Sequence, residues 1–127
     1  MSSSGRDPSE QTRRSVAAAI AKHFDGNSVL YDTFAASCAL QFAADAVNGQ
    51  TACDSGDLPR LRRLTHDLAS VLQVLGHQDL SELATRSERH ALDVNLAAAS
   101  ESWQALHDGL LRLCPPSIGR KGPLAAK

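Results

Sequence analysis

Apolar residues recur at spacings of three and four along most of this 127-residue chain, which is the pattern of amphipathic helices. No segment shows the strict alternation of apolar and polar residues that is typical of a half-buried strand. The short turns between the last four helical segments predict antiparallel neighbours. We therefore predict an all-α fold, an antiparallel up-down-up-down four-helix bundle with an additional N-terminal helix. The predicted helices cover residues 9–24, 28–53, 59–76, 79–92 and 96–113.

Capping residues mark several of the predicted helix ends. Ser9 and Asn95 are expected N-caps, because their side chains can accept hydrogen bonds from the first turn. Pro59 occupies a favoured position in the first turn, and Gly76 suits the left-handed conformation that follows a helix. Gly49 weakens the second helix by about 1 kcal/mol relative to alanine, so a kink or an early end there is an alternative to a continuous helix.

Two segments lack the helical pattern. Residues 1–8 and 115–127 are rich in small and polar residues and contain glycine and proline, so we expect both tails to be disordered. Residues 9–114 then form one helical domain, which is long enough to bury about two thirds of its unfolded surface.

Composition narrows the class of protein. The net charge of −1 argues against binding to nucleic acid or to an anionic membrane through net charge. No apolar run approaches the ~20 residues that span a bilayer, so a soluble protein is expected. The cysteines are odd in number and form no CxxC pair, which favours a reducing, cytoplasmic location over a disulfide framework. They are Cys38, Cys53 and Cys114.

His66 lies on the polar side of the helix predicted over residues 59–76. At about 100° per residue, the apolar side chains of this helix fall in one sector and His66 lies nearly opposite to them. By periodicity alone, an ordinary exposed histidine is the more typical interpretation. The apolar sector contains Leu61, Leu64, Leu68, Val71, Leu72 and Leu75, and the stripe of His66 contains Arg62, Ala69, Ser70 and Gln73.

The segment HDLASVLQVLG (66–76) has a histidine followed by leucine at +2 and +9 and by glycine at +10. It resembles the signature of histidine-containing phosphotransfer (HPt) domains, and by helix layout the resemblance covers about residues 10–114. The family usually has lysine at +3 and glycine at +4, where this chain has Ala69 and Ser70. The resemblance implies a four-helix bundle in which His66 relays a phosphoryl group between receiver-domain aspartates.

The resemblance also implies the partners and the roles of the neighbouring residues. The expected partner is a response-regulator receiver domain, a hybrid sensor histidine kinase, or both, and Mg²⁺ is expected on the receiver. The protein itself is expected to be a monomer without a cofactor, and it is not expected to be an enzyme. The residues expected to dock the receiver and stabilise the phosphoryl group are Arg62, Ala69, Ser70 and Gln73.

General chemistry is consistent with this role for His66. Histidine is mostly neutral at pH 7, and a neutral ring nitrogen is a nucleophile. Phosphoryl transfer needs mainly positioning and charge stabilisation. Small side chains at Ala69 and Ser70 leave room for a partner, and Arg62 offers positive charge in place of the missing lysine.

Alternative interpretations remain open. A docking module that binds a receiver or a kinase without being phosphorylated would also tolerate the loss of the lysine, and a helical bundle unrelated to phosphorelays is a third possibility. His77 is a rival acceptor at a helix end. No metal site is expected, because no two of the five histidines are spaced i,i+4 and no Glu-x-x-His pair occurs.

Overall fold

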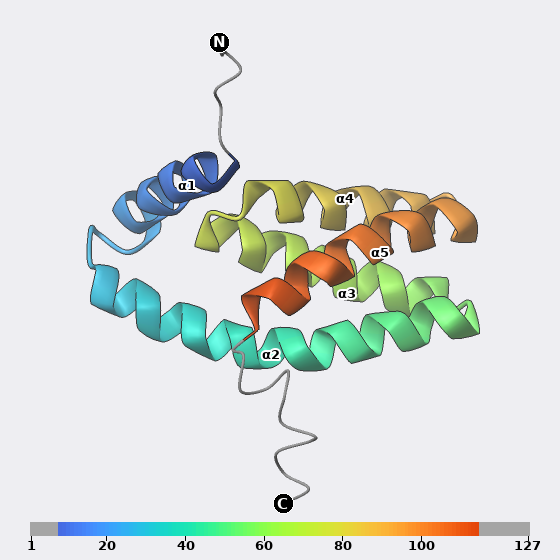
Figure 1. The fold of residues 1–127 in the computed structure, drawn as a ribbon. Helices are drawn as coiled ribbons and strands as arrows, with labels where there is room; N and C mark the ends of the chain where they lie inside the picture. Colours follow the sequence, from blue (N-terminus) through green and yellow to red (C-terminus); the bar gives the residue numbers. More distant parts are fainter. Residues whose placement is uncertain (1–7, 115–127) are drawn as a thin grey trace, which may run out of the picture.

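The computed structural model describes residues 8–114, and within this range every secondary-structure element is a helix (Figure 1). The prediction of an all-α protein is therefore confirmed. The segments predicted to be disordered lie outside the described residues, apart from Pro8. The first helix begins at Pro8, one residue before the expected cap, because the fixed φ of proline suits a first helical turn. The helices are α1 (Pro8–His23), α2 (Ser28–Ser55), α3 (Leu58–Leu75), α4 (Gln78–Leu92) and α5 (Leu96–Leu113).

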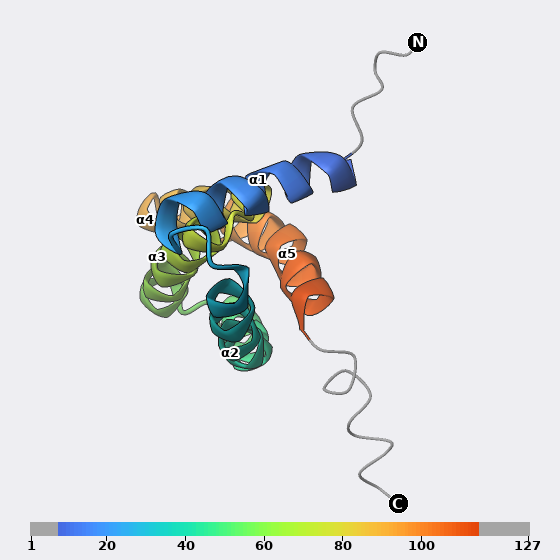
Figure 2. The same cartoon turned by 90° about the vertical axis from the view of Figure 1, so that its left-hand side faces the viewer.

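The last four helices pack in a closed series of contacts. α3 packs along α4, α4 packs along α5, and α2 contacts both α3 and α5. α1 has a smaller contact with α3. Figure 2 shows α2 nearly end-on, and α1 runs across this direction beside the ends of the other helices. The interior is therefore enclosed by α2, α3, α4 and α5.

The expected helix ends at Asn95 and Gly76 are confirmed, whereas Ser9 lies inside α1 and is not its N-cap. The side chain of Asn95 accepts a hydrogen bond from the backbone N–H of Ala98 at 3.1 Å, so the expected N-cap is confirmed. Gly76 has a φ of 89° after the last residue of α3, as expected for a left-handed end. A side chain at Gly76 would also collide with the backbone of Ser15 and Val16. Because glycine has no side chain, α1 packs closely against this turn.

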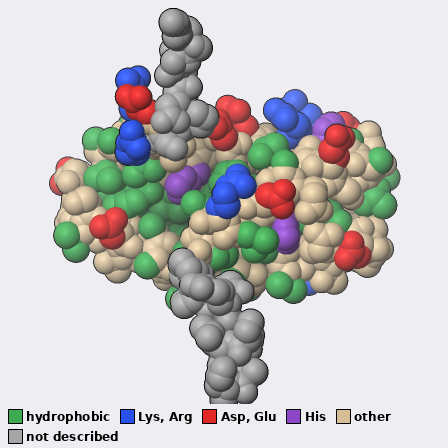
Figure 3. All heavy atoms as spheres, in the orientation of Figure 1, with side chains coloured by type: hydrophobic (Ala, Val, Ile, Leu, Met, Phe, Trp, Pro, Cys, Tyr) green, Lys and Arg blue, Asp and Glu red, His purple; other side chains and the backbone are tan. Residues whose placement is uncertain are grey.

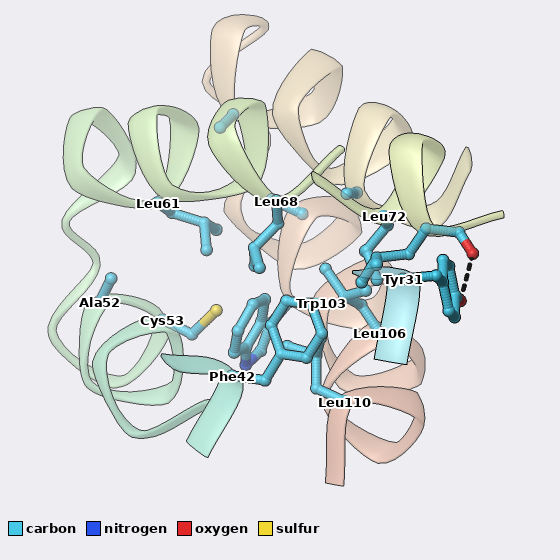
Figure 4. Packing of buried hydrophobic residues seen from close by; sticks show 14 of the residues in the cluster. Tyr31, Phe42, Ala52, Cys53, Leu61, Leu68, Leu72, Trp103, Leu106 and Leu110 are labelled. Atoms are coloured by element: carbon cyan, nitrogen blue, oxygen red, sulfur yellow. Dashed lines mark hydrogen bonds between the residues drawn. The ribbon is translucent and has the colours of Figure 1, made fainter. Parts of the chain in front are cut away.

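The core is built from leucines around one tryptophan (Figure 4). Trp103 is completely buried between α2 and α5. α2 does not end early at Gly49, because the helix continues through this residue to Ser55, and the indole ring of Trp103 occupies the space beside it. The fully buried leucines of this core are Leu61, Leu72, Leu75, Leu106 and Leu110.

The α1–α2 end of the molecule carries exposed apolar side chains. Figure 3 shows hydrophobic side chains gathered at this end, with acidic and basic side chains interspersed over the whole face in view. Among the exposed apolar residues of α2, Val29 is 73%, Leu30 52% and Phe34 39% exposed. Among residues 8–114, no helix is long and apolar enough to cross a membrane.

Candidate functional site

His66 projects from the outer face of α3. Its side chain is 64% exposed, whereas Leu68 and Leu72 of the same helix are buried in the core. The predicted position of His66 opposite the apolar sector is confirmed. Because the helix is anchored by its leucines, His66 is presented on a rigid element while its ring stays accessible to a partner.

A carboxylate from the neighbouring helix contacts the ring of His66. Nδ1 of His66 lies 3.0 Å from Oε2 of Glu88, a residue 22 positions further along the chain. The Glu88 side chain is only 19% exposed, so it is held between the helices. An ionised carboxylate has no hydrogen to donate, so Nδ1 is the donor in this hydrogen bond. In the neutral ring, the lone pair then resides on Nε2, on the other side of the imidazole.

The contact between His66 and Glu88 depends on the register of α3 against α4. A tight turn at Gly76 joins the two helices, and the hydroxyl of Ser81 donates a hydrogen bond to the carbonyl oxygen of Ala69 at 2.8 Å. On the far side of α4, the hydroxyl of Ser87 donates to the carbonyl oxygen of Ala99 in α5 at 3.1 Å. These two bonds, one partly buried and one buried, fix α4 against its neighbours, and Glu88 is thereby fixed beside His66.

The four residues expected around His66 differ in accessibility. Ser70 and Gln73 are exposed, as expected for a docking surface. Arg62 is half-buried, one turn before His66. Ala69 is half-buried and packs against the core at the α3–α4 contact. It therefore lies beneath the docking surface and not on its exposed edge.

α4 contributes more to this face than the sequence indicated. Gln73 shares with α4 a shallow groove of about 350 Å³, which contains two arginine side chains. The contribution of α4, including Glu88, was missed, because the helical pattern places polar residues outward but does not say which flank meets another helix. One signal could have found Glu88: it directly follows Ser87, which is buried, so it lies near the edge of the helix packing. The groove residues on α4 are Gln78, Ser81, Glu82, Thr85, Arg86 and Arg89.

The rival acceptor His77 occupies a different environment. It is half-buried just before α4, and burial lowers the pKa of its imidazole below the usual value. The structure gives this ring no carboxylate partner among residues 8–114. It lines a groove with residues of α1 and α5, and no residue of the His66 stripe lines that groove.

The described part of the chain brings no three His, Cys, Asp or Glu side chains together in a way that could hold a metal ion. What it does present is an accessible histidine nitrogen beside a carboxylate that orients the ring. Comparison of the chain with protein-family models, with curated proteins and with solved structures gave no match.

Proposed function

We propose that this protein is a histidine phosphotransfer protein, in which His66 takes a phosphoryl group from a receiver-domain aspartate and passes it to another. The observation that carries the proposal is the exposed imidazole whose Nδ1 is bound by Glu88 at 3.0 Å. We also infer that α2 to α5 form an antiparallel up-down-up-down four-helix bundle with α1 as an additional helix, which the contacts among these four helices support.

The transfer step uses the lone pair of Nε2. Nε2 attacks the phosphorus of the aspartyl phosphate, the P–N bond forms, and the P–O bond to the aspartate breaks with its electron pair leaving on the carboxylate. The imidazole ring gains positive charge while Nδ1 keeps its hydrogen. Glu88 stabilises this charge through the Nδ1–H hydrogen bond, which becomes charge-assisted. In the proposed return step, the bonds form and break in the opposite order.

The remaining tasks belong to the partner. The receiver, or the receiver of a hybrid sensor histidine kinase, supplies the aspartate and the Mg²⁺ that neutralises the phosphoryl oxygens. Exposed Ser70 leaves room for the receiver beside His66, and exposed Gln73 offers it a polar contact. Half-buried Arg62 is the basic residue of this stripe one turn before His66, and we propose that it stabilises the phosphoryl group.

A docking module that is not phosphorylated is the second candidate function. The observation that favours it is the half-buried alanine at position 69, which leaves α3 without the cation that the family signature places three residues after the histidine. The two candidates differ in one measurable property, because only the phosphotransfer protein forms a phosphoramidate bond at His66.

The test measures phosphorylation in two ways. The chain is incubated with phosphoramidate, a small donor that needs no docking, and separately with a panel of phosphorylated receiver domains. The proposal predicts acid-labile, base-stable phosphate on the parent chain in both reactions and none on His66→Gln. The matched control His23→Gln changes an exposed histidine at the end of α1 and should be labelled like the parent.

Each outcome decides between the candidates. Labelling of His66→Gln at the parental rate would overturn the assignment of the site. Binding of receivers without any label on the parent, from either donor, would establish the docking module. Far-UV circular dichroism of His66→Gln should match that of the parent, because the exposed ring contributes nothing to the core.

A further inference from the structure

A third groove lies between α2 and α3, on the other flank of α3 from α4. It has a volume of about 210 Å³, which is below the 300–1,000 Å³ usual for sites that enclose a small-molecule ligand. A groove of this size accommodates a single long side chain. Apolar side chains make most of its walls, and two carboxylates are its only charged groups. The lining residues are Cys38, Gln41, Phe42, Asp45, Leu64, Asp67, Leu68 and Val71.

The carboxylate of Asp45 is the unusual group in this groove. Asp45 is 8% exposed and is the only charged residue of α2 between Asp32 and Asp54. Its Oδ1 accepts one hydrogen bond, from Nε2 of Gln41 at 3.1 Å, and within residues 8–114 its other oxygen has no donor. A buried carboxylate is costly unless a cation and further hydrogen bonds compensate it.

The surroundings of Asp45 increase this cost. Burial is the main cause that raises the pKa of its carboxyl group; the hydrogen bond from Gln41 lowers this pKa, and the nearby charge of Asp67 raises it. No ion pair joins either carboxylate to a basic side chain of the described chain. The groove therefore combines apolar walls with one buried and one exposed carboxylate, neither of which is paired with a basic side chain of residues 8–114.

We propose that this groove receives one lysine or arginine side chain of a partner protein, with the charged head between Asp45 and Asp67 and the methylene stem against Phe42, Leu64 and Val71. Long basic side chains bury their apolar stems while the charged end makes hydrogen bonds, and the groove offers both environments. Complementary charge of this kind fixes the register of a docked protein.

The position of Asp67 places the groove next to the proposed docking face. Asp67 follows His66 directly on α3 and is exposed, so a protein that covers His66 reaches the mouth of the groove. The inference does not depend on phosphorylation of His66, because the groove, its charges and its walls lie outside that chemistry.

Cys38 allows a direct test because its thiol lines the groove. The folded chain is equilibrated separately with three symmetric disulfides: bis(4-aminobutyl), bis(4-hydroxybutyl) and dipentyl disulfide, each with its own thiol at a fixed ratio. In each exchange the Cys38 thiolate attacks the disulfide, a mixed disulfide forms and one thiol is released. Peptide mass spectrometry gives the modified fraction at Cys38. Half-buried Cys114, at the end of α5, is the control in the same molecules.

The expected result is a preference for the amine over the alcohol of about fivefold or more at Cys38, since a charge-assisted contact in a partly desolvated site is worth at least 1 kcal/mol. Cys114 should show a ratio near one. Asp45→Asn should remove the preference at Cys38, whereas the control Asp32→Asn, at an exposed carboxylate of the same helix, should keep it. If bis(4-hydroxybutyl) disulfide modifies the same fraction of Cys38 in Asp45→Asn as in the parent, the groove of the variant is intact.

Other outcomes overturn the inference. Equal amine and alcohol fractions in the parent would show that the carboxylates do not select a cation. A preference that survives Asp45→Asn would place its cause elsewhere. A larger fraction with the pentyl chain would indicate an apolar occupant. Modification of Cys114 but not of Cys38 by every reagent would show that the groove is closed to a side chain.

Discussion

Gly49 of α2 lies directly against the indole ring of Trp103 in α5. A Cβ atom at position 49 would overlap the six-membered ring of the indole, so only glycine permits this approach. Trp103 is completely buried and its Nε1–H donates a hydrogen bond to the side-chain oxygen of Gln50 at 3.3 Å. The pair sets the distance between two of the helices that enclose the core.

Gly49→Ala should therefore destabilise the protein, although alanine is the better helix former. Helix propensity alone predicts a gain of about 1 kcal/mol in the free energy of unfolding, whereas overpacking of a core costs about 1–3 kcal/mol. Urea denaturation measures the difference. The cost should fall in a Trp103→Phe background, where the smaller ring leaves room. A gain in stability for Gly49→Ala would show that the helices separate without cost.

Glu88→Ala should slow phosphorylation of His66 by phosphoramidate about ten- to a hundredfold, because a charge-assisted hydrogen bond is worth about 1.5–3 kcal/mol. Glu88→Gln should be intermediate, because its amide oxygen still accepts from Nδ1–H without the charge. Nitrogen-15 spectra of the ring should show less of the Nδ1–H tautomer in Glu88→Ala. Glu82→Ala, at an exposed carboxylate of the same helix, is the control. Parental rates and an unchanged tautomer in Glu88→Ala would remove Glu88 from the site.

Ala69→Lys should speed transfer from a phosphorylated receiver, up to about a hundredfold if the new contact forms only in the transition state. Residue 69 is one turn after His66, but it lies at the α3–α4 contact, so the ammonium must extend along α4 to reach the phosphoryl group. If Arg62 already stabilises the phosphoryl oxygens, Arg62→Ala should slow the parent more than the lysine variant. Rates for the four proteins of this double-mutant cycle measure the coupling, and strictly additive effects would exclude Arg62 as the substitute.

The stability of the protein should respond to pH through Asp45. Its folded-state pKa is raised above the ordinary value of 3.8, first by burial and then by Asp67. As the pH falls from neutral toward 3.8, the folded chain binds a proton at Asp45 before the unfolded chain does, and this stabilises the folded state. The stabilisation is lost as the pH rises through the folded-state pKa. His77, whose pKa burial lowers, acts in the opposite direction, and it is present in both proteins of the comparison.

The comparison is between the parent and Asp45→Asn. The free energy of unfolding in urea is measured for both proteins at several values between pH 7 and pH 4. As the pH falls, the parent should gain stability relative to Asp45→Asn. Asp67→Asn, at an exposed carboxylate, should give a smaller change of the same sign, because Asp67 acts on Asp45 only through its charge. Parallel curves for the parent and Asp45→Asn would show that the carboxyl group of Asp45 is solvated in the folded protein.

Local sequence was sufficient to predict the helices and the face that carries His66. The periodic leucines of α3 are buried and His66 is exposed, because the side of a helix on which a residue lies follows from its position along the chain. The caps at Asn95 and Gly76 were equally predictable, since each acts within one helical turn.

Contacts between helices were decided only by the tertiary structure. Glu88 reaches His66, Gly49 meets Trp103, and Asp45 lies in a groove beside Asp67, and each of these pairs joins two different helices. Such pairs depend on the crossing angle and register of packed helices. These are set by the fit of many side chains at once, and the periodicity of a single helix carries no information about which residue of its neighbour lies opposite.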